Sequence, residues 1–218
     1  MNQFTTNLEM NKAYWDSRFS EEGKIWGETP SKSAFYALTL FRQYRIQKIL
    51  IPGSGYGRHT KLFSENRYKT VGIEISKIAF EMAKKFDPQT TFINTSVLEM
   101  NNIEENFDAI YCYNVLHLFL TNERHNFLKK CYTKLNKNGL VFFTVFSEKE
   151  ASFGKGKELE KNTFESKPWR PTHYSSEDDL IKQFKDFNLI ETDIIKEPEN
   201  HGEIGPHNHI LRYIFAQK

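Results

Sequence analysis

Cysteine is almost absent from this sequence, which has only Cys112 and Cys131 among its 218 residues. Two cysteines are too few for a disulfide framework, and they fit a reducing cytoplasm, in which free cysteine behaves as a small buried apolar residue. Long apolar runs are missing as well, since no stretch approaches the roughly 20 residues that a membrane-spanning helix needs. Residues 1–15 lack the apolar core flanked by basic residues that is typical of a signal peptide. We therefore expect a soluble cytoplasmic protein with no membrane partner.

Charge of one sign is not concentrated anywhere in the chain. The 30 Lys and Arg residues nearly balance the 28 Asp and Glu residues, and both kinds are spread along the sequence. Proteins that bind nucleic acids usually carry a basic block or stripe, so this pattern predicts no nucleic-acid partner. The length suits a single α/β domain, or one domain with a cap. We expect a monomer or a homodimer.

Short apolar segments alternate with amphipathic segments through the middle of the chain. The predicted strands are residues 48–51, 69–75, 90–95, 107–116 and 140–146, and the predicted helices are residues 58–66, 76–86 and 122–135. Strands that alternate with helices of this length favour a parallel sheet with right-handed crossovers. Two further strands, 189–197 and 209–217, are too close together for a crossover helix and should pair antiparallel.

These elements predict an α/β fold with a single Rossmann-like, doubly wound sheet of seven strands. The sheet should be mostly parallel, with the last strand antiparallel and helices on both faces. Residues 1–43 form a separate helical, aromatic N-terminal segment, and residues 44–218 carry the sheet. Residues 147–171 are polar and rich in Gly and Lys, so we expect a mobile loop there with one buried residue, Trp169.

Glycine is scarce too, but three of the 11 glycines alternate in the stretch Gly53-Ser54-Gly55-Tyr56-Gly57. This stretch lies where the first strand ends and a helix begins. Glycine permits unusual backbone angles and lets a ligand approach the backbone closely. The acid Glu74 follows the last of these glycines by 17 positions, at the end of the second strand. A glycine loop followed by such an acid suits a ligand that carries ribose hydroxyls.

Two ligand classes fit this arrangement, a dinucleotide and S-adenosylmethionine. The dinucleotide fingerprint G-x-G-x-x-G/A needs a small third residue for close packing of helix and strand. Arg58 stands at that position here. The large cation, and the antiparallel tail in place of a second mononucleotide-binding half, disfavour an NAD(P)-dependent oxidoreductase but leave it as an alternative.

The segments "ILIPGSGYGRHT", "VGIEIS", "FDAIYCYNVLHLF" and "LNKNGLVFF" resemble, in order and spacing, those of class I S-adenosylmethionine-dependent methyltransferases. With the tail, the resemblance covers about residues 47–217. The N-terminal "YWDSRFSEEGKIWGETPS" and the C-terminal "GPHNHILRYIFAQK" resemble the tellurite- and thiopurine-methyltransferase type, which acts on small molecules. The resemblance implies methyl transfer from S-adenosylmethionine to a small-molecule acceptor such as a thiol or a chalcogen oxyanion.

The resemblance also implies which residues contact the cofactor. The glycine loop is expected near the methionine part, Glu74 at the ribose hydroxyls, and the segments after the third and fourth strands beside the adenine and the methionine. The residues so assigned in the sheet region are Gly53, Ser54, Gly55, Gly57, Arg58, Glu74, Ile75, Ser76, Ser96, Val97, Leu98, Tyr113, Asn114 and Val115.

The N-terminal segment is expected to close over the cofactor as a lid. Trp15 and Trp26 would exclude water there, and Arg18 would meet a carboxylate. The alternative is that the two tryptophans are ordinary core residues of a packed helix. Tyr14, in the same segment, is a candidate catalytic residue, and His117, just past the fourth strand, is another.

Two positions depart from the family pattern. The family usually has an acid two residues before the first loop glycine, where Ile51 stands, and another at the position of Ser96. Both departures weaken the predicted anchoring of the cofactor. They leave a non-catalytic S-adenosylmethionine-binding protein as a second alternative.

The acceptor is expected near Tyr174 and His207, from the polar segment and the final turn. His201, His207 and His209 cluster in the sequence, but we interpret His207 and His209 as pointing to opposite faces of a strand, which is poor geometry for one ion. No Cys pair or His-Glu helix motif accompanies them. The sequence therefore predicts no metal site.

Overall fold

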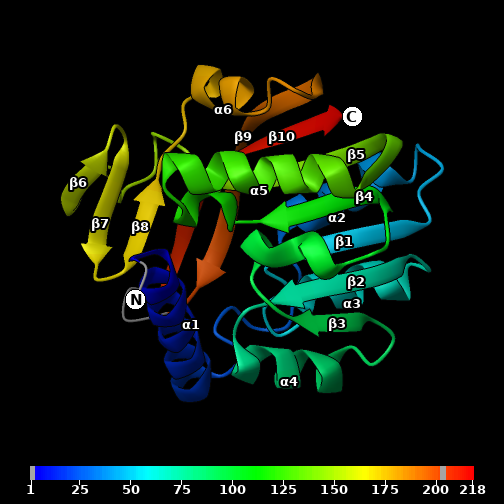
Figure 1. Cartoon of the computed structure of the whole chain (residues 1–218), viewed down its shortest axis with the longest axis horizontal. Coiled ribbons are helices and arrows are strands. Elements are labelled where there is room, and N and C mark those ends of the chain that lie inside the picture. The colour runs from blue at the N-terminus through cyan, green and yellow to red at the C-terminus, as the bar shows by residue number, and fades with distance from the viewer. Residues whose placement is uncertain (1–2, 202–204) are drawn as a thin grey trace.

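The structure is a computed structural model that describes residues 3–201 and 205–218. A seven-stranded sheet forms its centre, in the order β3-β2-β1-β4-β5-β10-β9 (Figure 1). The strands of this sheet are β1 (Lys48–Pro52), β2 (Lys69–Glu74), β3 (Thr91–Asn94), β4 (Phe107–Tyr113), β5 (Leu135–Phe146), β9 (Asn188–Asn200) and β10 (Pro206–Gln217). The helices are α1 (Gln3–Glu22), α2 (Lys32–Phe41), α3 (Arg58–Glu65), α4 (Lys77–Phe86), α5 (Thr121–Lys134) and α6 (Glu177–Gln183), with short 3-10 turns η1 (Val97–Asn102) and η2 (Leu116–Leu118).

The pairing of the strands confirms the predicted fold class. Strands β1 to β5 pair in parallel, and β10 runs antiparallel to both of its neighbours, β5 and β9. The register places Ile214 of β10 opposite Phe143 of β5. All the parallel strands therefore end at one edge of the sheet, where open α/β sheets bind their ligands.

Alternating strand residues bury both faces of the sheet. Leu50 packs with Phe127 of α5 on one face, whereas its neighbours Ile49 and Ile51 pack with Phe63 of α3 on the other. Successive side chains of a strand point to opposite faces, so a strand that is covered on both sides reads as a continuous apolar run. Ile51, which stands where the family usually has an acid, is 1% exposed in this core.

The predicted N-terminal helical segment comprises α1 and α2. Ser31 caps α2 by accepting a hydrogen bond from Ala34 N, as the sequence "PSKS" indicates. In Figure 1, α1 (blue) lies beside α4, and Asp16 accepts hydrogen bonds there from Ser76 Oγ at 2.6 Å and Ile78 N at 3.2 Å. None of the described helices is long and apolar enough to cross a membrane.

The segment 147–171 differs from its prediction as a mobile loop. It contributes to a second, antiparallel sheet of three strands, β6 (Lys157–Glu160), β7 (Thr163–Lys167) and β8 (Arg170–His173). These strands are short and carry polar residues on both faces, so they lack the alternation by which a half-buried strand is recognised. The prediction of a buried Trp169 is wrong as well, because this residue occupies a turn with φ of 61° and is 50% exposed.

Candidate functional site

A cavity of about 1520 Å³ opens at the carboxyl ends of the parallel strands. Its wall is formed by the glycine loop, the ends of β2 and β4, η1, the N-terminal segment, the end of β9 with His201, and the start of β10. The predicted site residues that line it are Trp15, Arg18, Trp26, Gly53, Ser54, Gly55, Arg58, Glu74, Ile75, Ser96, Val97, Leu98, Tyr113, Asn114, Val115, His117 and His207. The fold thus brings together residues that are far apart in the sequence.

The glycine loop connects β1 to α3 through left-handed backbone conformations. Gly53, Gly55 and Gly57 have φ values of 67°, 56° and 94°. A Cβ atom at Gly53 would lie 2.3 Å from Val115 Cγ2, so this glycine is required by packing. A Cβ atom at Gly55 would meet only Phe19 Cζ, at 3.9 Å. Gly55 is therefore the loop position at which the backbone is open to the cavity.

Glu74 ends β2 and is bonded to the glycine loop. Its carboxylate accepts hydrogen bonds from Gly55 N and Ser76 N, each at 2.8 Å. Asn94 fixes the same strand end by donating to the carbonyl oxygens of Glu74 and Ile75. The side chain is 5% exposed, and burial raises the pKa of Glu74 to about 7, although backbone N–H groups of Ser76, Gly55 and Ile75 favour its charged form.

The ends of β3 and β4 supply the neighbouring walls. Ser96 caps η1 by accepting a hydrogen bond from Leu98 N at 3.1 Å, which places Val97 and Leu98 on the cavity. Asn114 has a φ of 55°, unusual for a residue with a side chain, and it is held by Thr144, which donates to Asn114 Oδ1 and accepts from Asn114 N. This turn ends β4 and aims Val115 at Gly53.

The N-terminal segment covers the glycine loop. Tyr56 Oη donates to Gly27 O at 2.6 Å and accepts from Trp26 N at 3.1 Å, and the rings of Tyr56 and Trp26 stack with centroids 6.3 Å apart. The guanidinium of Arg18 lies 5.5 Å from the ring centroid of Trp26 and donates to Glu22. Trp15 also packs against this cluster. The predicted aromatic cover over the loop is thus present, while its function as a lid stays a prediction.

His117 lies on η2 at the cavity wall and is 3% exposed. Its ring stacks on Phe146 with centroids 4.4 Å apart, and its Nδ1 atom has no hydrogen-bond partner among the described residues. Burial, assisted by Arg170, His209 and His173, lowers the pKa of His117 well below its usual value. The imidazole is therefore neutral at physiological pH.

Four predicted site residues do not line the cavity: Tyr14, Gly57, Ser76 and Tyr174. Gly57 precedes α3 and is packed against Thr60 and Ala83. The Ser76 side chain instead caps α4, by accepting a hydrogen bond from Ala79 N, and donates a hydrogen bond to Asp16. Tyr174 was expected at the acceptor, but it is 4% exposed and donates to Ser152.

Tyr14 does not line the cavity itself, but it is hydrogen-bonded to Arg170, which does. Its hydroxyl accepts a hydrogen bond from Arg170 at 2.9 Å. Burial acts to raise the pKa of Tyr14, but the charge and hydrogen bond of Arg170 outweigh it and lower the pKa. Arg170 itself was missed by the sequence analysis, since nothing in "KPWRPT" signals that β8 carries it to the cavity.

Arg58 lines the cavity, but its charge is already paired. Its guanidinium donates to Trp26 O at 3.0 Å and to Glu199 at 2.9 Å, and Tyr113 Oη donates to the same carboxylate oxygen at 3.0 Å. Both side chains of the Arg58–Glu199 ion pair are less than a tenth exposed. Arg58, whose size disfavours a dinucleotide-binding loop, thus connects α3 to β9 and to the N-terminal segment.

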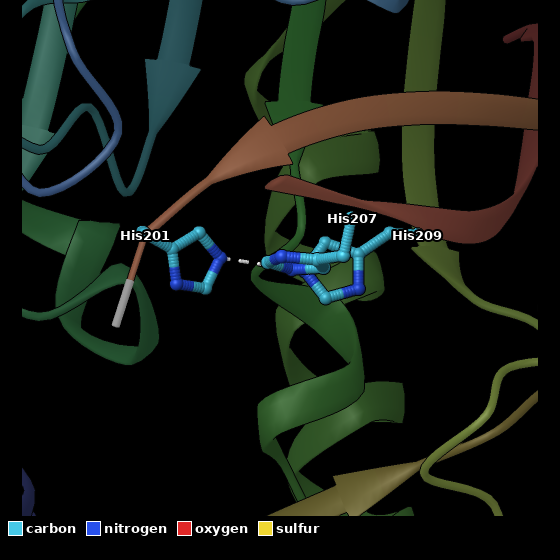
Figure 2. Close-up of side chains that lie close together, drawn as sticks. All are labelled: His201, His207 and His209. Carbon is cyan, nitrogen blue, oxygen red and sulfur yellow. Dashed lines mark hydrogen bonds between the residues drawn. The ribbon is translucent and has the colours of Figure 1, made fainter. Parts of the chain in front are cut away.

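The predicted orientation of the histidines is wrong. His207 and His209 lie two residues apart in β10 and so share a face of the strand, and His201 directly follows β9. Their Nε2 atoms converge, with 3.2 Å between His207 and His209 and 3.5 Å between His209 and His201 (Figure 2). All three residues line the cavity. Burial, with the neighbouring His207, lowers the pKa of His201 to about 4.

Comparison with known proteins gives a family match in the central part of the chain. Residues 50–143, from β1 to β5, match the family described as "Methyltransferase domain". A search of curated protein sequences finds no significant match. The domain match favours methyl transfer over the nicotinamide-dependent alternative.

Solved structures resemble the whole chain. The Burkholderia thailandensis 1,6-didemethyltoxoflavin-N1-methyltransferase, with 1,6-didemethyltoxoflavin and S-adenosylhomocysteine bound, has a TM-score of 0.74 and 17% identity over 100% of this chain and 91% of that one. TehB from Haemophilus influenzae has a TM-score of 0.67 and 15% identity over 94% of this chain and 67% of that one. The magnesium protoporphyrin IX methyltransferase of Synechocystis, with bound SAM, has a TM-score of 0.67 and 12% identity over 97% of each chain. At such identities the likeness establishes the fold. Residues 50–143 therefore match a methyltransferase domain, and the chain has the class I, Rossmann-like methyltransferase fold, as the resemblance in its sequence predicts.

Proposed function

We propose that this chain transfers a methyl group from S-adenosylmethionine to a small-molecule acceptor. The methyltransferase domain match supports the reaction class. Structural neighbours with bound S-adenosylmethionine or S-adenosylhomocysteine support the cofactor, and the toxoflavin-type neighbour supports a small acceptor. Single-ligand pockets usually measure about 300–1000 Å³. The cavity of about 1520 Å³ accordingly has room for a cofactor and an acceptor side by side.

The observation that carries the proposal is the bond between Glu74 and Gly55 at the cavity wall. An ionised carboxylate has about four acceptor positions. Backbone N–H groups of Gly55 and Ser76 occupy two of them, one on each oxygen. Two positions remain for the two ribose hydroxyls. The open backbone at Gly55 suits the methionine part of the cofactor, and Ile75 and Leu98 offer apolar contacts to an adenine.

S-adenosylmethionine supplies a methyl group on a positively charged sulfur, and the transfer to a nucleophile neutralises that charge. The chain therefore needs no strong electrostatic clamp, and orienting the reactants and excluding water provide much of the rate. Trp15 and Trp26 cover the glycine loop and exclude water from it. Asn114, in its strained turn, holds the end of β4 against the loop.

On the acceptor side, His117 lines the cavity and stacks on Phe146. His207 also lines the cavity and lies next to His209, which stacks on the same phenylalanine. The neutral ring of His117 can accept a hydrogen bond from an acceptor hydroxyl, amine or thiol. Tyr14 accepts a hydrogen bond from Arg170 and so positions the Arg170 guanidinium at the cavity.

We assign residues 1–43 to a lid and residues 44–218 to the methyltransferase domain proper. The absence of acids at Ile51 and Ser96 leaves Glu74 as the principal anchor of the cofactor.

Two measurements test this function. Calorimetric titration with S-adenosylmethionine and, separately, with NAD should give saturable binding for the first and none for the second. A panel of thiol, selenium, tellurium and amine acceptors, with an isotope-labelled methyl donor, should then yield a labelled product. Binding of NAD in preference to S-adenosylmethionine would refute the proposed cofactor. Tight cofactor binding with no product from any acceptor would favour the non-catalytic alternative.

A further inference from the structure

The side chains of His201, His207 and His209 form a compact cluster (Figure 2), and all three line the cavity. One ring nitrogen from each lies within 4.8 Å of the others. Two of the three Nε2 separations, 3.2 Å for His207–His209 and 3.5 Å for His209–His201, lie close to the spacing in a tetrahedral metal site. In such a site, nitrogens about 2.0–2.1 Å from a zinc ion lie about 3.3 Å from one another.

The Nδ1 atoms of His207 and His209 already have hydrogen-bond partners, and these partners determine whether the Nε2 atoms carry a proton or a lone pair. His207 Nδ1 lies 2.7 Å from Gly205 O, which can only accept, so the proton is on Nδ1. His209 Nδ1 lies 3.0 Å from Glu150 Oε1, a carboxylate that is likewise an acceptor. When both rings carry only this Nδ1 proton, their Nε2 atoms present lone pairs to each other at 3.2 Å. Two lone pairs at this distance repel unless a cation lies between them.

The environment of Glu150 completes the arrangement. This carboxylate is 7% exposed and also accepts a hydrogen bond from Ile210 N at 2.6 Å, so its position is fixed by the backbone of β10. Histidines that bind metals usually donate their other ring nitrogen to a carboxylate or a backbone carbonyl, which sets the tautomer and orients the ring. His209 has such a carboxylate partner in Glu150, and His207 has such a carbonyl partner in Gly205.

We propose that His201, His207 and His209 bind a divalent transition-metal ion of the zinc class, with Glu150 as the positioning residue for His209. Three neutral imidazoles suit Zn²⁺, and three protein ligands with one free position are typical of zinc sites that bind a further ligand. Among the side chains that the structure describes, no fourth His, Cys, Asp or Glu joins the group. The free position faces the cavity, which all three histidines line.

This site has a consequence that rests on the proposed function. His209 stacks on Phe146, with centroids 5.0 Å apart, and Phe146 stacks on His117, so the ion lies at the acceptor side of the cavity. A metal ion stabilises the deprotonated form of a thiol or hydroxyl that binds to it. An acceptor bearing such a group would release its proton to solvent and bind the ion as the anion, which is the more nucleophilic form.

The metal site is tested on the full chain without methyl donor or acceptor, so its outcome does not depend on the proposed function. The chelator-stripped protein is titrated with Zn²⁺ in a calorimeter, and with Co²⁺ while visible absorption is recorded. We expect one equivalent of Zn²⁺ per chain and the intense absorption of four-coordinate cobalt. His201→Ala and His207→Ala should each weaken zinc binding at least tenfold, and Glu150→Gln should weaken it about 10–100-fold. His125→Ala, at an exposed position of α5, is the matched control and should bind as the parent does.

Circular dichroism of each variant separates loss of a ligand from loss of the fold, and the cobalt spectrum of the parent chain depends on no variant. The inference is overturned if the stripped parent chain binds less than stoichiometric Zn²⁺ or gives only the weak spectrum of six-coordinate cobalt. It is also overturned if folded His201→Ala and His207→Ala bind zinc as tightly as His125→Ala, because the rings then share only a proton. Zinc binding without methyl transfer would refute the proposed function and leave the metal site standing.

Discussion

Glu74 accepts a hydrogen bond from the backbone of Gly55 at 2.8 Å, so the end of β2 and the loop after β1 form one rigid corner of the cavity. The residues are 19 positions apart in the sequence and come from neighbouring parallel strands. This contact orients the carboxylate before any ligand arrives. Preorganised groups of this kind bind with less loss of conformational freedom.

The first prediction concerns the charge of this corner. Glu74→Gln keeps the size of the side chain but replaces one accepting oxygen with a donor, which faces the donor N–H groups of the loop and the ribose hydroxyls. We expect the affinity for S-adenosylmethionine to fall by about 1–3 kcal/mol, the usual effect of leaving a buried polar partner unpaired. Calorimetric titration measures this loss. Glu99→Gln, at an exposed position of η1, is the control, and equal affinities in the two variants would remove Glu74 from the site.

The second prediction is a pH dependence with a defined sign. Burial raises the pKa of Glu74 to about 7, and ribose hydroxyls donate to the ionised form. Cofactor affinity should therefore rise as the pH increases through about 7, with protons released on binding. Titrations at several pH values, in buffers of different ionisation enthalpy, measure both effects, and Glu74→Gln should abolish them. An affinity that is flat from pH 6 to 8 would contradict the assignment.

The second prediction also has a consequence for the stability of the ligand-free protein, because it rests on the same pKa shift of Glu74. Because the folded-state pKa of Glu74 lies above the ordinary value of 4.5, the folded chain binds more protons than the unfolded chain between pH 4.5 and about 7. The contribution of this group to the free energy of unfolding is therefore full below pH 4.5 and falls as the pH rises to about 7. Denaturant unfolding across this range should show a smaller fall for Glu74→Gln, whose amide does not titrate. A fall of equal size in both proteins would assign the effect to other groups.

The third prediction separates backbone strain from ligand contact in the glycine loop. Gly55→Ala introduces a methyl group on the cavity wall at a φ of 56°, and Gly154→Ala introduces one at a φ of 77° where no atom lies within 4 Å. Both variants should lose about 1–2 kcal/mol of stability, because alanine is strained in left-handed backbone. Only Gly55→Ala should also lose cofactor affinity, by tenfold or more. Cofactor titration and thermal unfolding of both variants measure the two effects, and an unimpaired Gly55→Ala would show that the loop does not touch the ligand.

The sheet and this corner were predictable because their signals are local. Apolar runs, a cap such as Ser76 and three alternating glycines each indicate structure within a few residues, and the end of β2 is adjacent to the loop in any parallel pairing. The tie between Arg58 and Glu199 could not be predicted, since it joins residues 141 positions apart. The β-strands of segment 147–171 gave no periodic signal. The histidine cluster was misjudged for a different reason: the spacing of two residues was present in the sequence, and it favours a shared face of the strand.

The fourth prediction tests the lid. Trp15 is half-buried in the aromatic cluster over the glycine loop and lines the cavity, so Trp15→Ala should weaken cofactor binding by about 1 kcal/mol, or roughly fivefold. Phe35→Ala, an aromatic truncation at an exposed position of α2, is the control. Deletion of residues 1–28 is a poorer test, because it also removes the carbonyl groups that Tyr56 and Arg58 bond. If Trp15→Ala matches the parent in both affinity and turnover, the segment is ordinary packing and not a lid.

The last prediction concerns the ion pair that joins α3 to β9. Glu199→Leu preserves much of the side-chain volume but leaves the Arg58 cation and the Tyr113 hydroxyl without their shared acceptor. Removal of one partner from a buried pair usually lowers the free energy of unfolding by about 3–5 kcal/mol, because the remaining charge stays desolvated. Glu22→Leu provides the control, since it breaks the Arg18–Glu22 pair, in which Glu22 is 40% exposed, and should lose less than about 1 kcal/mol. Denaturant unfolding compares the two, and similar losses would show that water already screens the Arg58–Glu199 pair.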